Sequence, residues 1–272
     1  DKRRDKEIPY VVFQAEDNDT VITMYTSGKV MFQGVSADVD ATMWKEIDGQ
    51  TETKEEKVQD NTYHDCSSIG SDEVGTGDYF GPIVVTASFV KKEDVSFLDN
   101  LGVKDSKKMT DDIILKIAPQ IAKRIQYKSI ILTNEEYNKH HQRETNMNKI
   151  KAIMHNKVLY QLVQEVKEPY DYIIVDEFAR ENRYYEYIQE AQNIQRGITF
   201  MTKAEDKNLA VACSSIISRY LFLKEFDRMS DQLHIPLPKG AGPNVDKIGE
   251  EIVDTYGRDK LREVAKLNFK NT

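Results

Sequence analysis

Two adjacent carboxylates, Asp72 and Glu73, stand just before the glycine-rich stretch Gly75-Thr76-Gly77. Adjacent residues of a strand point to opposite faces, so the two acids share one site only if the strand ends or twists there. Gly75 permits such a turn, and a Gly-X-Gly stretch lets backbone groups approach a ligand closely. The alternative, on spacing alone, is a surface hairpin with incidental acids.

Acidic residues also stand at the end of one apolar run and just before one predicted helix. Asp176 ends the apolar run 171–176, and the carboxyl ends of strands face the active site in open α/β sheets. An acid can also be merely the first polar residue after a core strand, which is the more common case. Glu205 and Asp206 precede a long apolar helix, where acids usually serve capping and the helix dipole.

Together these positions supply up to four carboxylates without a plausible Cys/His nucleophile set. Oxygen-only ligands suit Mg²⁺ or Mn²⁺ rather than zinc. Clusters of Asp and Glu that hold two divalent ions are a standard solution for phosphodiester hydrolysis. His155 lies in a predicted helix and is interpreted as a satisfied structural group. The lysine-bearing loops 105–110 and 238–242 either hold a phosphate or are ordinary solvated loops.

The elements that must position these residues form an α/β pattern after residue 66. Strands are predicted at 67–74, 83–90, 128–132 and 172–175, and helices at 110–125, 146–166, 205–229, 244–256 and 258–267. Residues 9–34 read as three short strands, followed by a short helix over 36–47. Residues 48–64 are almost purely polar and are typical of a linker.

Charge and composition set further limits. The net charge is −8, of which residues 1–60 carry −6, whereas the tail 256–272 is slightly basic and includes Lys266 and Lys270. This distribution is compatible with a polyanionic partner, and we expect those two lysines to contact phosphates. No apolar run approaches the roughly 18 residues of a membrane span, and no secretory signal is visible. The two cysteines form no disulfide framework, so we expect a cytoplasmic protein without a membrane partner.

The motif Gly70-Ser71-Asp72-Glu73-Val74-Gly75-Thr76-Gly77-Asp78-Tyr79-Phe80-Gly81-Pro82 resembles the signature of type 2 ribonucleases H, in the form of the bacterial ribonuclease HIII branch. Further matches run in family order over residues 66–272: Asp105-Ser106-Lys107-Lys108, Asn148-Lys149-Ile150-Lys151-Ala152 with His155-Asn156, the strand that ends at Asp176, Lys203-Ala204-Glu205, Ser214–Tyr220, and Pro238-Lys239-Gly240-Ala241-Gly242. The stretch Tyr25–Gly34 resembles that branch's N-terminal domain, which is similar to the TATA-box-binding protein fold.

This resemblance implies a ribonuclease-H-like mixed α/β sheet flanked by helices, and an endonuclease that cuts the RNA strand of RNA/DNA hybrids. It implies two Mg²⁺ or Mn²⁺ ions and 5′-phosphate and 3′-hydroxyl ends. The family's four catalytic and metal-binding carboxylates match Asp72, Glu73, Asp176 and Glu205. The residues matched to substrate binding are Gly75, Thr76, Gly77, Ser106, Lys107 and Lys239. The backbone of the first three reads 2′-hydroxyls, which distinguish RNA from DNA.

The resemblance also implies a domain plan: a small N-terminal α+β substrate-binding domain over 1–47, a linker over 48–65 and a catalytic domain over 66–272, in a monomer. The family's strand and helix before Pro9 are expected to be absent, which would truncate the small domain. Two rival functions are ribonuclease HII-like cleavage at single ribonucleotides in DNA and a non-catalytic nucleic-acid-binding module. The Asp78–Pro82 string disfavours the first, and the presence of all four carboxylates disfavours the second.

Overall fold

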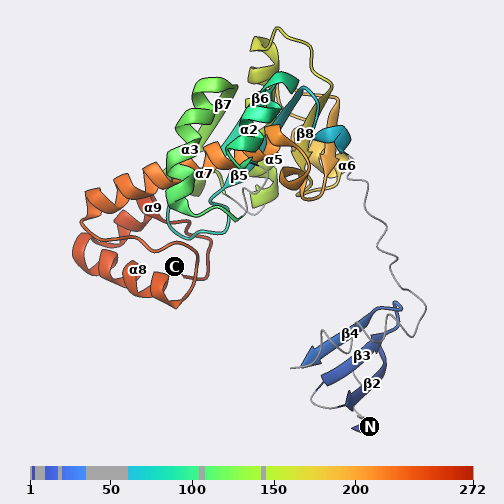
Figure 1. Cartoon of the computed structure of the whole chain (residues 1–272). Helices are drawn as coiled ribbons and strands as arrows, with labels where there is room; N and C mark the ends of the chain where they lie inside the picture. Colours follow the sequence, from blue (N-terminus) through green and yellow to red (C-terminus); the bar gives the residue numbers. More distant parts are fainter. Residues whose placement is uncertain are drawn as a thin grey trace. The chain divides into compact units, whose positions relative to one another are not determined.

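The computed structural model describes residues 2–3, 10–17, 20–34, 61–103, 108–141 and 145–271. The chain divides into two compact units, residues 1–60 and 61–272, which are described separately (Figure 1). The predicted helix over 36–47 and most of the predicted linker lie outside the described residues. Residues 61–65, assigned to the linker from the sequence, lie in the second unit. Among the described residues, no helix has the length and apolar character needed to cross a membrane.

The first unit is a four-stranded antiparallel sheet. Its strands are β1 (Lys2–Arg3), β2 (Val11–Asp17), β3 (Thr20–Tyr25) and β4 (Val30–Gly34), in that order across the sheet. The three predicted strands are present, and β1 adds a two-residue strand before Pro9, where none was expected. β1 pairs antiparallel with β2 and so forms one edge of the sheet.

The second unit is built on a five-stranded mixed sheet in the order β7-β6-β5-β8-β9. The strands are β5 (Ser68–Val74), β6 (Ile83–Val90), β7 (Gln126–Leu132), β8 (Tyr172–Asp176) and β9 (Ile198–Met201). The central strand β5 runs antiparallel to β6 and parallel to β8. The four predicted strands are confirmed within two residues at each end, and the predicted mixed α/β class is confirmed. The four-residue strand β9 was not predicted.

Helices cover both faces of this sheet (Figure 1). The long helices are α3 (Asp111–Arg124), α5 (Met147–Glu165), α7 (Leu209–Leu233) and α8 (Pro243–Tyr256). The short elements are η1 (Asn61–Tyr63), η2 (Lys92–Asp94), α2 (Val95–Asn100), α4 (Asn134–His140), α6 (Glu181–Tyr187), η4 (Ala204–Asp206), η5 (Arg258–Lys260) and α9 (Leu261–Val264). The helix predicted over 258–267 is therefore replaced by the shorter η5 and α9.

The two faces of β5 pack against different helices because side chains alternate along a strand. Ile69 lies in the apolar cluster that includes α5, whereas the neighbouring Gly70 faces α7. A Cβ at Gly70 would lie 2.5 Å from the backbone nitrogen of Val211, so only glycine allows α7 to approach β5 this closely. This contact fixes the depth at which α7 lies on the strand that carries Asp72 and Glu73.

Candidate active site

Asp72 and Asp176 lie side by side at the carboxyl ends of two parallel strands. Ser71 pairs with Val175 as the last pair of the β5–β8 register, so Asp72 and Asp176 are the next residues on the two strands. Both follow residues that face α5, so both side chains point to the α7 face of the sheet. The parallel register of β5 and β8 thus brings these two acids to the same edge of the sheet.

Glu205 reaches the same face from η4. The backbone N–H of Ala204 donates to Oδ1 of Asp176 at 2.9 Å, which ties this turn to the end of β8. Glu205 is half-buried, whereas the neighbouring Asp206 is exposed. The helix predicted from residue 205 begins instead at Leu209, because Asn208 is the residue whose side chain accepts the N–H of Val211 and caps α7. Glu205 is therefore not the capping group of that helix.

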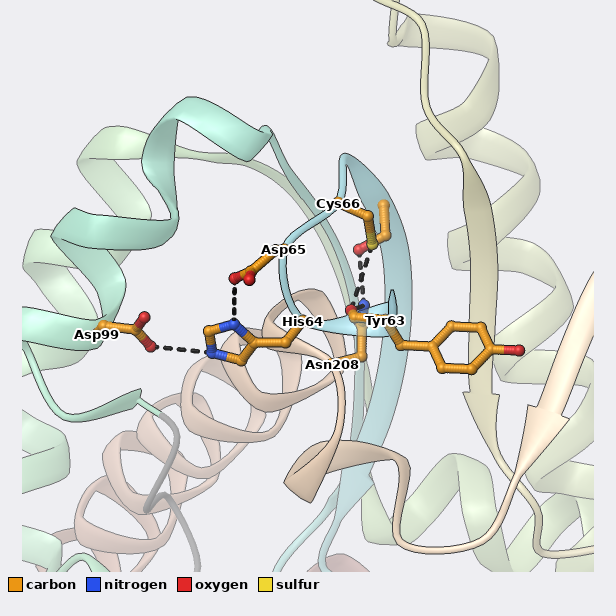
Figure 2. A network of polar contacts seen from close by, with 7 residues as sticks. Tyr63, His64, Asp65, Cys66, Asp99 and Asn208 are labelled. Carbon is orange, nitrogen blue, oxygen red and sulfur yellow. Dashed lines mark hydrogen bonds and ion pairs between the residues drawn. The ribbon is translucent and has the colours of Figure 1, made fainter. Parts of the chain in front are cut away.

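Asn208 also anchors this corner to the beginning of the second unit (Figure 2). Its Nδ2 donates to the carbonyl of Tyr63 at 2.7 Å and to Oγ of Ser68, the first residue of β5, at 2.8 Å. Beside this contact, the ring nitrogens of His64 hydrogen-bond to Asp65 and Asp99 (Figure 2). The turn that carries Glu205 is thereby held against β5 by side chains that no local sequence pattern indicated.

The carboxylate of Asp72 meets the hydroxyl of Ser215 and the charges of two other acids. Burial raises its pKa well above the usual aspartate range, and the nearby charges of Glu73 and Glu205 raise it further. The hydroxyl of Ser215 donates to the carboxylate, and the backbone N–H of Glu73 donates to its Oδ1 at 2.9 Å; both lower the pKa without cancelling the shift. The hydroxyl of Ser218, in α7, donates to the backbone carbonyl of Asp72 at 3.2 Å.

Glu73 is turned to the opposite face, against α5. Its Oε2 lies 2.9 Å from Nε2 of His155, and its Oε1 forms an ion pair with Lys151. Burial alone would raise the pKa of Glu73, but the hydrogen bond and charge of His155, together with the ammonium of Lys151, lower it to about 2. His155 is also bonded to Oγ of Ser71 at 2.7 Å, so it is a satisfied buried histidine, as the sequence indicated, and its partner is one of the predicted acids.

Of the remaining predicted residues, Lys239 lines a cavity together with Glu205. The cavity has a volume of about 350 Å³, and its polar lining comprises Asp78, Asp111, Glu205, Ser215, Arg219 and Lys239. Lys239 forms an ion pair with Asp111, to which Arg219 also donates at 2.6 Å. Burial favours a raised pKa for Asp111, but the hydrogen bonds from Lys239 and Arg219 lower it overall. Lys239 thus lies beside the acids, and Arg219 joins it there without having been predicted.

The glycine-rich turn follows β5 directly. Gly75 has φ of +95°, and a Cβ at this position would lie 2.2 Å from the carbonyl oxygen of Pro82, so the turn requires glycine. Gly75 is buried, Thr76 is half-buried and Gly77 is exposed. Ser106 and Lys107 lie outside the described residues.

The donor chemistry of Asp72, Asp176 and Glu205 fits a hard divalent ion, because these half-buried carboxylates offer only oxygen and repel one another. Within the described ranges, no three His, Cys, Asp or Glu side chains form a complete cage for a metal. The carboxylate of Glu73 is held by α5 on the other face of β5. The site is therefore an acidic corner whose charges a bound cation would balance.

A mixed sheet with acids at the ends of two adjacent parallel strands is the architecture of the ribonuclease H class of nucleases, and the family model described as "Ribonuclease HII" matches residues 69–272. Residues 1–57 match a "Domain of unknown function (DUF3378)". Ribonuclease HIII of Bacillus cereus is 39% identical over 271 residues, which cover 96% of this chain and 87% of that protein. Ribonuclease HIII of Listeria monocytogenes is 41% identical and covers 97% and 88%. The chain belongs to the ribonuclease HIII family.

Solved structures agree with this assignment. The crystal structure of Bst-RNase HIII in complex with Mn²⁺ is similar with a TM-score of 0.77 and 38% identity, covering all of this chain and 90% of that one. The ribonuclease H2 from Pyrococcus horikoshii covers 75% of this chain with a TM-score of 0.62 and 22% identity, and so shares the fold. The family resemblance expected from the sequence is confirmed.

Proposed function

We propose that this protein hydrolyses the RNA strand of RNA/DNA hybrids, using two Mg²⁺ or Mn²⁺ ions, and leaves 5′-phosphate and 3′-hydroxyl ends. The observation that carries the proposal is the acidic corner of Asp72, Asp176 and Glu205 on one face of the sheet, in a member of the ribonuclease HIII family. Divalent ions in such a corner activate a water and stabilise the leaving oxygen.

In this proposal Asp72 is the central ligand, because it lies next to Asp176 across the strands and its carboxylate senses the charges of Glu73 and Glu205. Asp176 is fixed by the Ala204 N–H, which leaves its second oxygen for a cation. Glu73 supplies a further carboxylate from the α5 face of the same strand. Lys151 and His155 keep Glu73 ionised next to Asp72 in the chain.

Substrate binding in this proposal uses the loops beside the acids. The backbone of Gly75, Thr76 and Gly77 reads the 2′-hydroxyls of the RNA strand, which is the group that separates RNA from DNA. Lys239, at the rim of the cavity with Glu205, contacts a phosphate. Ser106 and Lys107 belong to the same proposal on sequence grounds alone.

A cleavage assay tests the activity. The full chain is incubated with Mg²⁺ or Mn²⁺ and one of three labelled substrates: an RNA/DNA hybrid, a duplex RNA, and a DNA duplex with a single ribonucleotide. We expect cleavage of the hybrid at internal positions, with 5′-phosphate ends. Preferred cleavage at the single ribonucleotide would support the ribonuclease HII-like alternative, and binding without cleavage would support a non-catalytic module.

We also propose that the first unit contributes to hybrid binding, within the plan of a substrate-binding domain over 1–47 and a catalytic domain over 66–272. Its sheet exposes apolar side chains: Tyr10 is 80% exposed and Val12 is 60% exposed. Such side chains provide contact area for sugars and bases. The net charge of −6 over residues 1–60 opposes binding, but charge is screened beyond roughly 8–10 Å at physiological salt.

The dissociation constant of the hybrid, measured in Ca²⁺ at fixed salt for the full chain and for a fragment 61–272, tests this second proposal. Tighter or equal binding by the fragment would exclude a substrate-binding role for residues 1–60. The elution volume of the full chain from a size-exclusion column tests the expected monomer.

A cytoplasmic location is proposed from the two buried free cysteines, Cys66 and Cys213, which suit a reducing compartment.

A further inference from the structure

Lys266 is completely buried, with 0% of its surface exposed, although its position in the basic tail predicted a phosphate contact. That expectation is wrong. Its Nζ donates to the backbone carbonyls of Asp78 at 2.8 Å and of Gly81 at 2.6 Å. Burying an ammonium group is costly unless its donors are satisfied, so these two contacts explain how the side chain can remain inside.

The two carbonyls belong to the loop that follows the glycine-rich turn. The segment Val264–Lys266, here called the C-terminal strap, lies along this loop. The backbone N–H of Lys266 donates to the carbonyl of Tyr79 at 2.8 Å, and that of Gly81 donates to Val264 at 3.1 Å. An isolated antiparallel bridge joins Phe80 to Ala265. The strap and the loop therefore pair as a short ladder, and the Lys266 side chain bonds across its end.

The strap is held from its other side by α4. Nδ2 of Asn138 donates to the carbonyl of Ala265 at 2.8 Å and to that of Arg262 at 3.0 Å. Its Oδ1 accepts the N–H of Leu267 at 3.0 Å. The strap is consequently fixed between a helix and the loop, so it can support the loop.

The supported loop connects the two proposed substrate-binding segments. Oδ1 of Asp78 accepts the N–H of Gly240 at 2.7 Å, and the N–H of Tyr79 donates to the carbonyl of Gly240 at 2.8 Å. Asp78 directly follows Gly77, and Gly240 directly follows Lys239. A shift of the Asp78 carbonyl would thus move both the glycine-rich turn and the lysine that we place on a phosphate.

We propose that Lys266 is a positioning residue that holds the Gly75–Gly77 backbone in the geometry that reads the RNA strand. This inference rests on the proposed function, because it assumes that this backbone contacts 2′-hydroxyls. Recognition by backbone groups depends on their fixed positions, since no side chain can adjust to compensate for a displaced turn. Burial lowers the pKa of Lys266 to about 7, but a neutral amine still has two N–H donors for the two carbonyls, so the support persists in either protonation state.

The test compares full-length Lys266→Met with Lys270→Met, which removes the same charge from an exposed position in the same tail. Cleavage of an RNA/DNA hybrid gives KM and kcat, and binding in Ca²⁺ gives the preference for the hybrid over a DNA duplex of the same sequence. For Lys266→Met we expect KM to rise about tenfold and the hybrid preference to fall about tenfold, with kcat within about threefold, as for a displaced binding group. Lys270→Met removes an expected phosphate contact that both duplexes share, so it should weaken both to a similar extent and leave the hybrid preference unchanged.

A merely structural role predicts a lower melting temperature with unchanged KM and hybrid preference in the folded fraction, and this result would overturn the proposal. If Lys266→Met does not fold, Asn138→Ala loosens the strap from the α4 side while Lys266 remains. Asn138→Ala should shift KM and hybrid preference in the same direction by a smaller factor, and no shift would also overturn the proposal. A wild-type chain that fails to cleave hybrid refutes the proposed function itself, whereas a wild type that cleaves beside a Lys266→Met variant with unchanged preference refutes only this inference.

Discussion

Asp72 and Glu73 are neighbours in the chain, yet the two faces of β5 give them opposite electrostatic surroundings. On the α7 face, Asp72 meets the hydroxyl of Ser215 and the charges of other acids, and its pKa is raised. On the α5 face, Glu73 meets Lys151 and His155, and its pKa is lowered to about 2 despite burial. One strand therefore carries one carboxylate whose charge is uncompensated and one whose charge is neutralised within the protein.

The difference shows where the protein leaves room for an external cation. A buried carboxylate that lies among other acids gains more from a divalent ion than one that already has an ammonium partner. Ser215 and Ser218 of α7 bond to Asp72 through uncharged hydroxyl groups, which hold the residue without balancing its charge. Lys151 and His155 of α5 do hold Glu73 and also add a fixed structural link between that helix and the sheet.

Asp72→Asn gives the largest expected effect. The amide is nearly isosteric but is a poor ligand for hard cations, so cleavage of the hybrid should fall by on the order of 10³-fold or more, while the fold and hybrid binding are retained. The measurement is the single-turnover rate at saturating Mg²⁺, with circular dichroism as the control for folding. A rate near that of wild type would show that the α7 face of β5 is not the catalytic face.

Glu205→Gln and Asp206→Asn form the next test, because only the half-buried Glu205 senses Asp72 and lines the cavity. We expect Glu205→Gln to slow cleavage by on the order of 10²-fold, and the exposed Asp206→Asn by less than about threefold. Rates at saturating metal decide between the two. If Asp206→Asn is the crippling change, the fourth carboxylate has been placed one residue too early.

The sequence predicted the central strands and the long helices because these are the segments with strong periodicity. It missed β9, α4 and α6, which span only four to seven residues and are stabilised by the strands and helices around them. It placed the start of α7 four residues too early, because Glu205 and Asp206 look like first-turn acids and the true cap, Asn208, is identified only by its bonds to Tyr63 and Ser68.

The acids of the candidate site were predicted from strand ends and from the family motif, but strand alternation alone left open whether Asp72 and Glu73 share one face. The partners of these acids were not predictable in the same way. Glu73 and His155 are 82 positions apart in the chain, and no local pattern joins them. Lys266 was misassigned because a lysine among basic residues is usually exposed, and only the packing of the C-terminal strap shows otherwise.

Lys151→Met sharpens the comparison from the Glu73 side. The Lys151 and Glu73 side chains are only 11% and 13% exposed, so removing the ammonium leaves a buried charge uncompensated. We expect the free energy of unfolding to fall by about 3 kcal/mol and kcat/KM to fall roughly tenfold. The matched control is Lys157→Met, at an exposed position of the same helix, which should change the free energy of unfolding by less than about 0.5 kcal/mol.

The double variant Glu73→Gln/Lys151→Met completes a cycle. Because the two groups are in contact, its loss of stability should be smaller than the sum of the two single losses, by about 1–3 kcal/mol. Urea denaturation in EDTA supplies all four values without a bound metal. Additive losses would mean that Lys151 does not neutralise Glu73, and the contrast between the two faces would then rest on His155 alone.

Lys266 extends the comparison to a buried cation that is held by carbonyls instead of by a carboxylate, and its pH dependence is the smallest effect that we expect. Burial lowers its pKa to about 7, partly offset by the charge of Asp78, whereas an unfolded lysine titrates near about 10.4. Between these values the unfolded chain binds more protons, so the contribution of Lys266 to stability is fully present above about pH 10, falls as the pH drops towards 7 and is constant below that. The free energy of unfolding of wild type, minus that of Lys266→Met, should therefore rise by about 1 kcal/mol per pH unit between pH 7.5 and 9.5.

Urea denaturation at four pH values measures this difference, and Lys270→Met, run in parallel, should show no such slope. A flat difference for Lys266→Met would mean that the two carbonyls keep the ammonium charged throughout this range, and a buried charge would then need no carboxylate partner to stay ionised in this fold.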